Sequence, residues 1–190
     1  ASEGWQDSSM AIYAASRDAK AAVRWLYANV ETYQINTNYI STLGMSAGAS
    51  LAIMLGTTDE DIYRDELTLE DDPTLESTHL DQPADVHTVI ALSMTPAANT
   101  LMEIVYGVDT YDETDTPLMI MNGTEDTLAS FTEAEMLRDQ YEEIGVPYAF
   151  YAIEGAGHTL DMMQAEVNGR LPLELAFDFV VEQQTLGIED

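Results

Sequence analysis

The sequence predicts an α/β fold in which a mostly parallel sheet carries helices on both faces. Segments with helical periodicity alternate with apolar, β-prone segments, at spacings typical of βαβ units. These apolar segments are nearly continuous rather than alternating, as in strands that are buried on both faces. The chain has 190 residues, of which 46% are hydrophobic. We therefore expect residues 1–190 to form one domain with a sizeable core.

The first helix is expected at residues 9–30, which contain neither Gly nor Pro. Val23 and Leu26 belong to an apolar pattern of helical spacing there, which indicates an amphipathic helix. A later helix opens at Thr132 with a capping-box pattern and closes at Gly145. Two further helices are expected, at residues 49–55 and 171–184.

Four strands are expected where apolar and β-branched residues are densest, at residues 39–43, 86–94, 117–121 and 148–153. Residues 58–86 lie between the first two strands. They are rich in acidic residues and contain Pro73 and Pro83, which predicts a solvated acidic insertion rather than a second core.

The charge is strongly negative, with six Lys and Arg against 35 Asp and Glu and a formal net charge of −29. Such a charge repels phosphate backbones and anionic lipids, which argues against a nucleic-acid-binding or peripheral membrane protein. The absence of cysteine excludes disulfides, iron–sulfur clusters and thiolate zinc sites. Because Lys20 is the only lysine, we expect an acidic, hydrated surface suited to a saline environment, as in halophilic proteins.

The chain is expected to be soluble. No apolar stretch has the length of a bilayer span, and the polar first residues do not resemble a signal peptide. The composition does not distinguish a cytoplasmic from a secreted protein, so the compartment stays open.

Residues 44–48 form a Gly-x-Ser-x-Gly pattern between a predicted strand and a predicted helix. This pattern is typical of a tight strand-to-helix turn that exposes the serine hydroxyl, and Gly44 and Gly48 allow the turn to close. The simpler interpretation is a glycine-rich turn with an incidental serine. The strand before it and the helix after it favour Ser46 as a nucleophile.

A serine nucleophile needs a base that takes its proton and a carboxylate that orients the base. His158 is the predicted base, because it follows a strand and so lies at the carboxyl edge of the sheet, where the sites of parallel sheets form. His79 belongs to the acidic insertion, and His87 begins a buried strand, so both are expected to be solvated or structural. By the same rule Asp126 is the predicted acid.

Two other carboxylates compete with Asp126 for this position. Glu125 is the close competitor, because it precedes Asp126 in the same loop. Asp161 is a weaker competitor, since it lies beyond His158.

The order of Ser46, Asp126 and His158, each after a predicted strand, resembles the α/β-hydrolase superfamily. Residues 18–26, together with the motif at residues 44–48, are similar to the carboxylesterases, including the hormone-sensitive-lipase-like and the acetyl-xylan or feruloyl esterase groups. Residues 122–126 and 155–158 are similar to the acid and histidine loops of that family. The resemblance therefore covers three separate motifs, and it is specific to the superfamily rather than to a substrate.

The resemblance implies a serine carboxylesterase that hydrolyses short acyl esters through an acyl-serine intermediate. Ser46 would attack the ester, His158 would take the proton, and Asp126 would orient the imidazole. The Ala47 N–H would be one oxyanion donor. No metal and no organic cofactor is implied, and the partner is a small-molecule ester.

Members of the superfamily usually carry several strands before the nucleophile, and a His-Gly-Gly type loop there supplies a second oxyanion donor. Ser46 comes early in this chain, so we expect a truncated α/β-hydrolase fold, the C-terminal part of the usual one, which lacks the N-terminal strands. The strand before Ser46 would then lie at an edge of the sheet. Either a missing N-terminal segment or a homodimer would complete that edge.

Other functions stay open. One is a catalytically impaired α/β-hydrolase-like fragment or binding protein, and another is a peptidase of the same fold. A metal site at the acidic runs 59–61 or 70–72 is less favoured, because neither run has the spacing of a calcium-binding loop. Residues 94–97 and 101–106 are candidates for lining the substrate pocket, although we favour a packing role for them.

Overall fold

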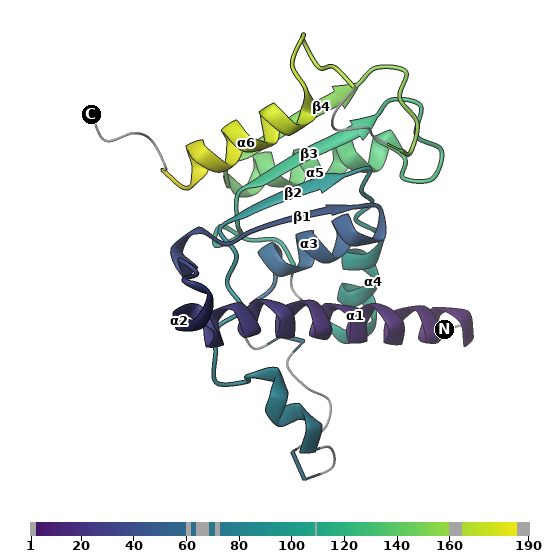
Figure 1. Cartoon of the computed structure of the whole chain (residues 1–190). Helices are drawn as coiled ribbons and strands as arrows, with labels where there is room; N and C mark the ends of the chain where they lie inside the picture. The colour runs from purple at the N-terminus through teal and green to yellow at the C-terminus, as the bar shows by residue number, and fades with distance from the viewer. Residues whose placement is uncertain are drawn as a thin grey trace.

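The computed structural model describes residues 3–59, 62–63, 69–70, 73–108, 110–159 and 165–185. Its centre is a four-stranded sheet whose neighbouring strands are all parallel (Figure 1). The strands follow one another in space as in sequence: β1 (Ser41–Met45), β2 (Thr88–Leu92), β3 (Leu118–Gly123) and β4 (Tyr148–Ile153). The predicted parallel sheet is therefore confirmed, and the carboxyl ends of all four strands meet at one edge.

Helices cover both faces of the sheet, as predicted. Helices α3 (Ala47–Thr57) and α5 (Phe131–Ile144) pack on one face, and α6 (Pro172–Gln183) packs on the other. Helix α1 (Glu3–Ala28) lies beyond α3 and packs against α3 and α4 (Ala97–Tyr106) (Figure 1). Three short helices complete the described elements: α2 (Val30–Tyr33), η1 (Thr37–Tyr39) and η2 (Pro73–Thr78). Within the described ranges, no helix has both the length and the apolar character that a membrane span requires.

Two helices differ from the sequence-based expectation. Helix α1 begins at Glu3, before the expected residue 9, and α4 was not expected to be helical. In α4, Met102 is fully buried and packs with Met54 and Tyr63, whereas Ile104 is 67% exposed. Of residues 101–106, Leu101 and Met102 pack against neighbouring side chains, whereas residues 103–106 are exposed.

The sheet separates two clusters of buried apolar side chains. Successive residues of a strand point to opposite faces, so Ile120 of β3 packs with Ile53 and Leu137 on one face, whereas Met121 packs with Phe179 on the other. Every residue of β2 and β3 is buried. This two-sided burial explains the nearly continuous apolar character of those strands.

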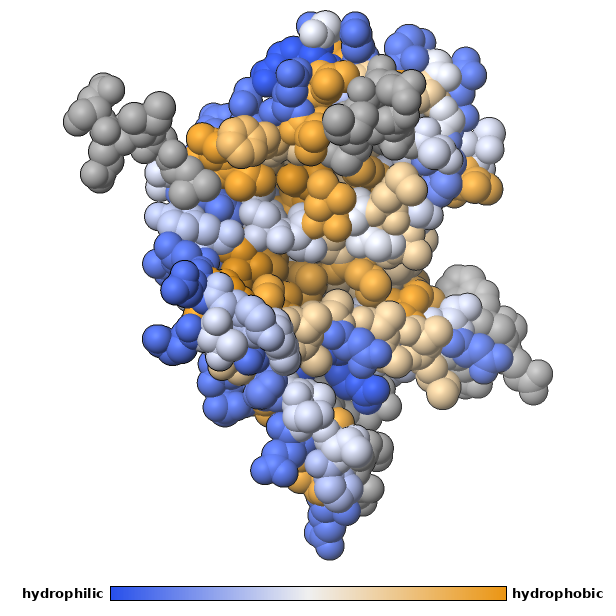
Figure 2. Space-filling view, viewed as in Figure 1, coloured by the Kyte–Doolittle hydropathy of each residue, from blue (hydrophilic) through white to orange (hydrophobic). Residues whose placement is uncertain are grey.

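Strand β1 is an edge strand of the described sheet. Because α6 packs over β2 and β3, Leu43 and Met45 of β1 are left 52% and 43% exposed. Beside the start of β1, residues of α1 that include Trp25 and Leu26 line a largely apolar groove of about 510 Å³. Figure 2 shows hydrophobic residues across the middle of this face, between α6 and α1. The expectation that a homodimer or an N-terminal segment completes this edge stays a prediction.

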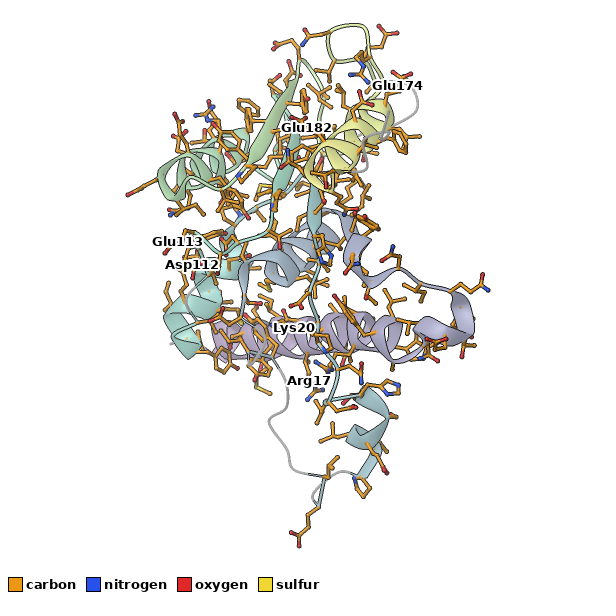
Figure 3. The ribbon with its side chains drawn as sticks, turned by 90° about the vertical axis from the view of Figure 1, so that its left-hand side faces the viewer. Arg17, Lys20, Asp112, Glu113, Glu174 and Glu182 are labelled. Carbon is orange, nitrogen blue, oxygen red and sulfur yellow. The ribbon has the colours of Figure 1, made fainter. Side chains whose placement is uncertain are left out.

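Helix α1 carries two buried cations, which hold the acidic insertion. Lys20 and Arg24 are 2% and 1% exposed, and Figure 3 places Lys20 along α1. Lys20 Nζ donates to the carbonyl of Thr58 (3.2 Å), and Arg24 Nε donates to the carbonyl of Thr78 (2.8 Å). Buried charges need such partners. These two bonds tie the insertion to α1 through backbone carbonyl groups.

The close packing of the turn after β1 gives a test of the fold. A Cβ atom at Gly44 would lie 2.0 Å from the backbone oxygen of Gly48, whereas a Cβ atom at Gly48 would meet nothing within 4 Å. We expect Gly44→Ala to destabilise the fold by about 1–3 kcal/mol, because the backbone must shift. The matched variant Gly48→Ala should be neutral or up to about 1 kcal/mol more stable, since alanine favours the helix.

Thermal or urea unfolding of the two variants and the wild type measures this difference. Equal stability of Gly44→Ala and the wild type would contradict the close contact between β1 and the start of α3.

Candidate active site

Ser46 lies on a sharp turn between β1 and α3. Its backbone has a φ of 55° and a ψ of −123°, and a φ in this left-handed region is uncommon for a residue with a side chain. The neighbouring strand holds the turn, because the Ser46 N–H donates to the Leu92 carbonyl (3.0 Å). This conformation is that of the strand-to-helix turn expected from the Gly-x-Ser-x-Gly pattern.

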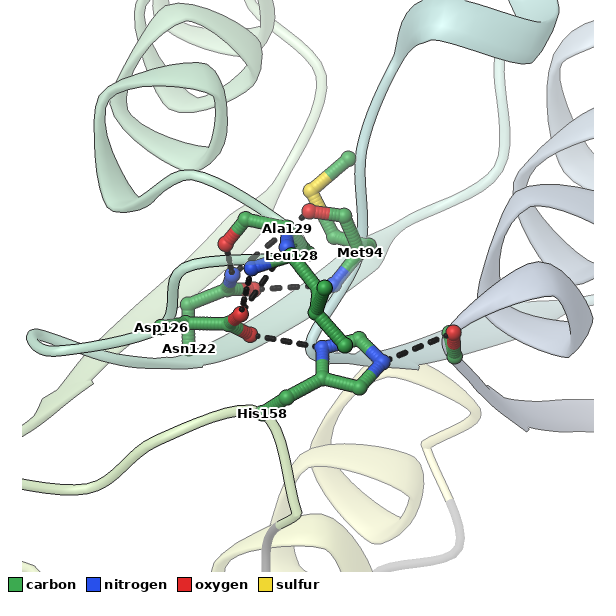
Figure 4. A network of polar contacts seen from close by, with 7 residues as sticks. Met94, Asn122, Asp126, Leu128, Ala129 and His158 are labelled. Carbon is green, nitrogen blue, oxygen red and sulfur yellow. Dashed lines mark hydrogen bonds and ion pairs between the residues drawn. The ribbon is translucent and has the colours of Figure 1, made fainter.

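One chain of hydrogen bonds joins Ser46, His158 and Asp126 (Figure 4). His158 Nε2 is 2.9 Å from Ser46 Oγ, and His158 Nδ1 is 2.9 Å from Asp126 Oδ2. The three residues follow β1, β4 and β3, so the shared carboxyl edge brings them together. When Nδ1 donates to the carboxylate, Nε2 is free to accept the serine proton, which is the arrangement that a general base requires.

The Asp126 carboxylate is held by the backbone of its own loop. Its side chain has no exposed surface, and Oδ1 accepts hydrogen bonds from the N–H groups of Leu128 and Ala129, each at 2.8 Å. Burial alone would raise the pKa of Asp126, but the bonds from Ala129, His158 and Leu128 together outweigh it and lower that pKa below its ordinary value. Asp126 therefore stays ionised while it orients His158.

Asn122 supports this loop, a contribution that the sequence did not assign to it. Its side chain is fully buried at the carboxyl end of β3. Oδ1 accepts from the Met94 N–H (3.1 Å), and Nδ2 donates to the carbonyls of Met94 (3.5 Å) and Ala129 (3.4 Å). The amide thus joins the loop after β2 to the Asp126 loop (Figure 4). The sequence feature that could have identified Asn122 is an amide side chain near the end of an otherwise apolar strand.

The other sequence candidates do not join this network. Glu125 is exposed, and its N–H donates to the Ala156 carbonyl (2.9 Å). His79 lies just after η2 in the insertion. His87 precedes β2, at the opposite edge of the sheet from Ser46. Asp161 lies outside the described residues.

The role of the Ala47 N–H as an oxyanion donor stays a prediction. Ala47 is the first residue of α3, and the first N–H groups of a helix have no acceptor within that helix. The helix dipole adds partial positive charge at the same end. An oxygen that gains negative charge beside Ser46 would therefore be stabilised there.

A mostly apolar pocket of about 460 Å³ opens beside the serine and the histidine. Helix α1 contributes Ala11, Ile12 and Ala15 to its wall. The remaining lining residues come from the turn after β1, from α3, from the loops after β2, β3 and β4, and from the start of α4: Ser46, Ala47, Ser50, Leu51, Ser93, Thr95, Ala98, Leu128, Ala129 and His158. The groove beside β1 has a similar volume, but neither Ser46 nor His158 lines it.

The sequence offered two roles for residues 94–97, lining of the substrate pocket and packing in the core, and the structure shows one residue in each role. Thr95 lines the pocket, whereas Met94 is fully buried in the core. Residues 101–106 contribute no side chain to the lining given above.

The described residues contain no group of three His, Asp or Glu side chains that could hold a metal ion. The acidic runs at 59–61 and 70–72 lie partly outside the described residues.

Comparison with protein families gives one match, the BD-FAE family model, over residues 6–97. This model describes an esterase domain of α/β-hydrolase type. The matched part of the chain includes α1 and the Ser46 turn. None of the curated proteins compared with the chain matches it significantly.

Several solved structures share the fold at low sequence identity. A truncated carbohydrate esterase from gut microbiota has a TM-score of 0.66 at 19% identity, over 90% of this chain and 68% of that one. Esterase 2 of Thermogutta terrifontis, phosphorylated by paraoxon, has a TM-score of 0.67 at 20% identity, over 90% and 64%. MGS-M1, an α/β hydrolase from a Medee basin deep-sea metagenome library, has a TM-score of 0.61 at 16% identity, over 88% and 64%.

The chain thus spans about two thirds of the length of these structures. The parallel sheet, the helices on both of its faces and the matched esterase domain agree with one another. The chain has the fold of the α/β hydrolases, and its first half matches an esterase family model.

Proposed function

We propose that this protein is a serine carboxylesterase that hydrolyses short acyl esters. The observation that carries the proposal is the unbroken hydrogen-bonded chain from Asp126 through His158 to Ser46, at the wall of an apolar pocket. A serine that is hydrogen-bonded to a histidine, which a buried carboxylate orients, has the geometry of an activated nucleophile.

In the first half of the proposed reaction, Ser46 Oγ attacks the ester carbonyl carbon while His158 Nε2 takes the hydroxyl proton. The carbonyl oxygen becomes negative and accepts the Ala47 N–H. The bond to the alcohol then breaks, and His158 returns the proton to the leaving oxygen. The product is an acyl group on Ser46 and a free alcohol.

In the second half, water replaces the alcohol. His158 Nε2 takes a proton from the water while its oxygen attacks the acyl carbon. The bond to Ser46 Oγ then breaks, and that oxygen regains the proton. Asp126 stays ionised throughout and stabilises the imidazolium that forms twice in each turnover.

The pocket supports a short acyl group. Ligand pockets commonly measure about 300–1,000 Å³, and this one, at about 460 Å³, lies in the lower part of that range. Its walls are mainly apolar, which suits a hydrocarbon chain better than a charged one. Two fold relatives have related chemistry: one is a carbohydrate esterase, and esterase 2 of Thermogutta terrifontis is phosphorylated by paraoxon.

The acidic surface is, in this proposal, suited to high salt. Among the described residues, Lys20 and Arg24 are buried, so the surface is poorer in cations than the composition indicates. Glu174 and Glu182 lie on α6 and Asp112 and Glu113 on the loop before β3 (Figure 3). In the described part of the chain, Arg17 pairs with Asp18, Arg138 with Glu135 and Asp139, and Arg170 with Asp178.

Replacement of the nucleophile tests the proposed function directly. We expect Ser46→Ala to lower kcat for p-nitrophenyl butyrate by at least about 10⁴-fold, because no acyl-enzyme can form. Paraoxon should add one diethylphosphoryl group to the wild type and none to the variant, as measured by intact mass. The control is Ser77→Ala, which changes an exposed serine in η2 and should leave both readouts unchanged.

Undiminished hydrolysis by Ser46→Ala would refute the esterase assignment to this site. Cleavage of peptide amides in preference to esters would instead favour a peptidase, and a wild type that neither hydrolyses esters nor reacts with paraoxon would favour a binding protein.

The two adjacent acids of the β3 loop give a second test. Asp126→Asn should lower kcat by about 10⁴-fold, because an amide favours the wrong histidine tautomer. Glu125→Gln removes the neighbouring, exposed carboxylate and should have little effect. Equal losses in the two variants, measured on the same ester, would show that His158 is not oriented by Asp126.

The surface charge predicts a response to salt. The melting temperature should rise between 0.1 and 2 M KCl, because the Debye length falls from about 10 Å to about 3 Å or less and repulsion between carboxylates weakens. Glu143→Lys, in the last turn of α5, should stabilise the protein by about 0.3–1 kcal/mol at low salt, and this gain should shrink at 2 M. A melting temperature independent of KCl would contradict the proposed adaptation.

A further inference from the structure

A second serine lies beside Ser46 at the carboxyl edge of the sheet. Met45 and Leu92 are paired across the β1–β2 ladder, so Ser46 and Ser93 follow neighbouring strands at the same level. Ser93 has a φ of 48°, close to the 55° of Ser46. Both serines line the pocket that contains His158. Strained backbone of this kind is concentrated at functional sites.

The Ser93 hydroxyl differs from the other polar groups of this pocket. Ser93 has no exposed surface, and its Oγ has no hydrogen-bond partner among the described residues. By contrast, Ser46 and His158 are bonded to each other, Ser50 Oγ donates to the Thr95 carbonyl (3.2 Å), and Thr95 Oγ1 accepts from the Ala97 N–H (3.2 Å).

A buried hydroxyl without a hydrogen-bond partner lowers the stability of the fold, and such a hydroxyl is available to bind a ligand or a water molecule. Among the described side chains that line the pocket, Ser93 thus carries the buried polar atom without a partner, and it follows the strand next to that of the nucleophile at the same level.

We propose that Ser93 Oγ holds the water molecule that hydrolyses the acyl group on Ser46, which makes Ser93 a further catalytic residue. The inference rests on the proposed esterase function. Once Ser46 is acylated, His158 Nε2 loses the serine proton as its partner, and the water takes that place. One hydrogen of the water then bonds to His158 and the other to Ser93 Oγ, which leaves an oxygen lone pair free for the acyl carbon.

The chemical step is balanced by the groups already named. The water oxygen forms the new bond to the acyl carbon, and its proton passes to His158 Nε2. The bond between that carbon and Ser46 Oγ breaks, and His158 gives the proton to Ser46. Ser93 exchanges no proton, so its role is to fix the direction of the attacking oxygen.

Methanol provides a sharp test, because it has only one hydroxyl hydrogen. Methanol can donate a hydrogen bond to His158 but has no second hydroxyl hydrogen for Ser93. Loss of the Ser93 hydroxyl should therefore slow the attack of water on the acyl group and leave the attack of methanol unchanged. With p-nitrophenyl butyrate in a fixed concentration of methanol, we expect Ser93→Ala to raise the ratio of methyl butyrate to butyrate by about 10-fold, the effect of one lost hydrogen bond. The value of kcat/KM should stay unchanged, since it reports acylation, which precedes the water step.

Ser93→Gly separates the hydroxyl from the strained backbone, because glycine adopts a φ of 48° without strain. The two variants should give the same product ratio. Both should melt at or above the wild-type temperature, because an unpaired hydroxyl has been removed.

Three results for Ser93→Ala would overturn the proposal. The first is an unchanged product ratio, and the second is a fall in kcat/KM with no change in that ratio. The third is a marked fall in melting temperature, which would show that the hydroxyl already has a partner in the protein. Failure of the proposed function itself gives a different result. In that case the wild type would release no p-nitrophenol above Ser46→Ala, and both proposals would fall together.

Discussion

The parallel hydrogen-bonded ladder from β1 to β4 is the constraint on which the site depends. Because every strand runs in the same direction and the spatial order follows the chain order, the loops after the four strands all emerge at one edge. Ser46 and Ser93 follow β1 and β2, Asp126 follows β3, and His158 follows β4. Side chains from distant parts of the sequence therefore reach hydrogen-bonding distance without any long loop that must fold back.

Much of the fold follows from local chemistry that the sequence displays. Strands buried on both faces need continuous apolar side chains, and β2 and β3 show this pattern in the sequence and are confirmed in the structure. Helix α4 was missed because it is short, follows Pro96 and ends in a run of apolar and β-branched residues, so local patterns did not separate it from a loop. The structure supplies the missing information, which is the fit of Met102 against Met54 and Tyr63.

Part of the candidate site was also predictable from local patterns in the sequence. The rule that polar groups gather after parallel strands selects Asp126 but leaves Glu125 as a close competitor. In the structure, the loop hydrogen bonds from Leu128 and Ala129 hold the Asp126 carboxylate inward. The roles of Asn122 and Ser93 depend on burial and on a positive φ. Neither property is encoded in a motif. The structure brings the three predicted residues together, and their catalytic roles are the subject of the substitutions proposed above.

The burial of Lys20 has a consequence for chemistry at side-chain amines. It is the only lysine in the chain, and α1 holds its ammonium group against the Thr58 carbonyl, away from solvent. Acylating reagents that react with free lysine amines would modify residue 20 only when the insertion separates from α1. Because no other lysine competes for the reagent, the mass of the peptide that contains residue 20 would report the rate of that local opening.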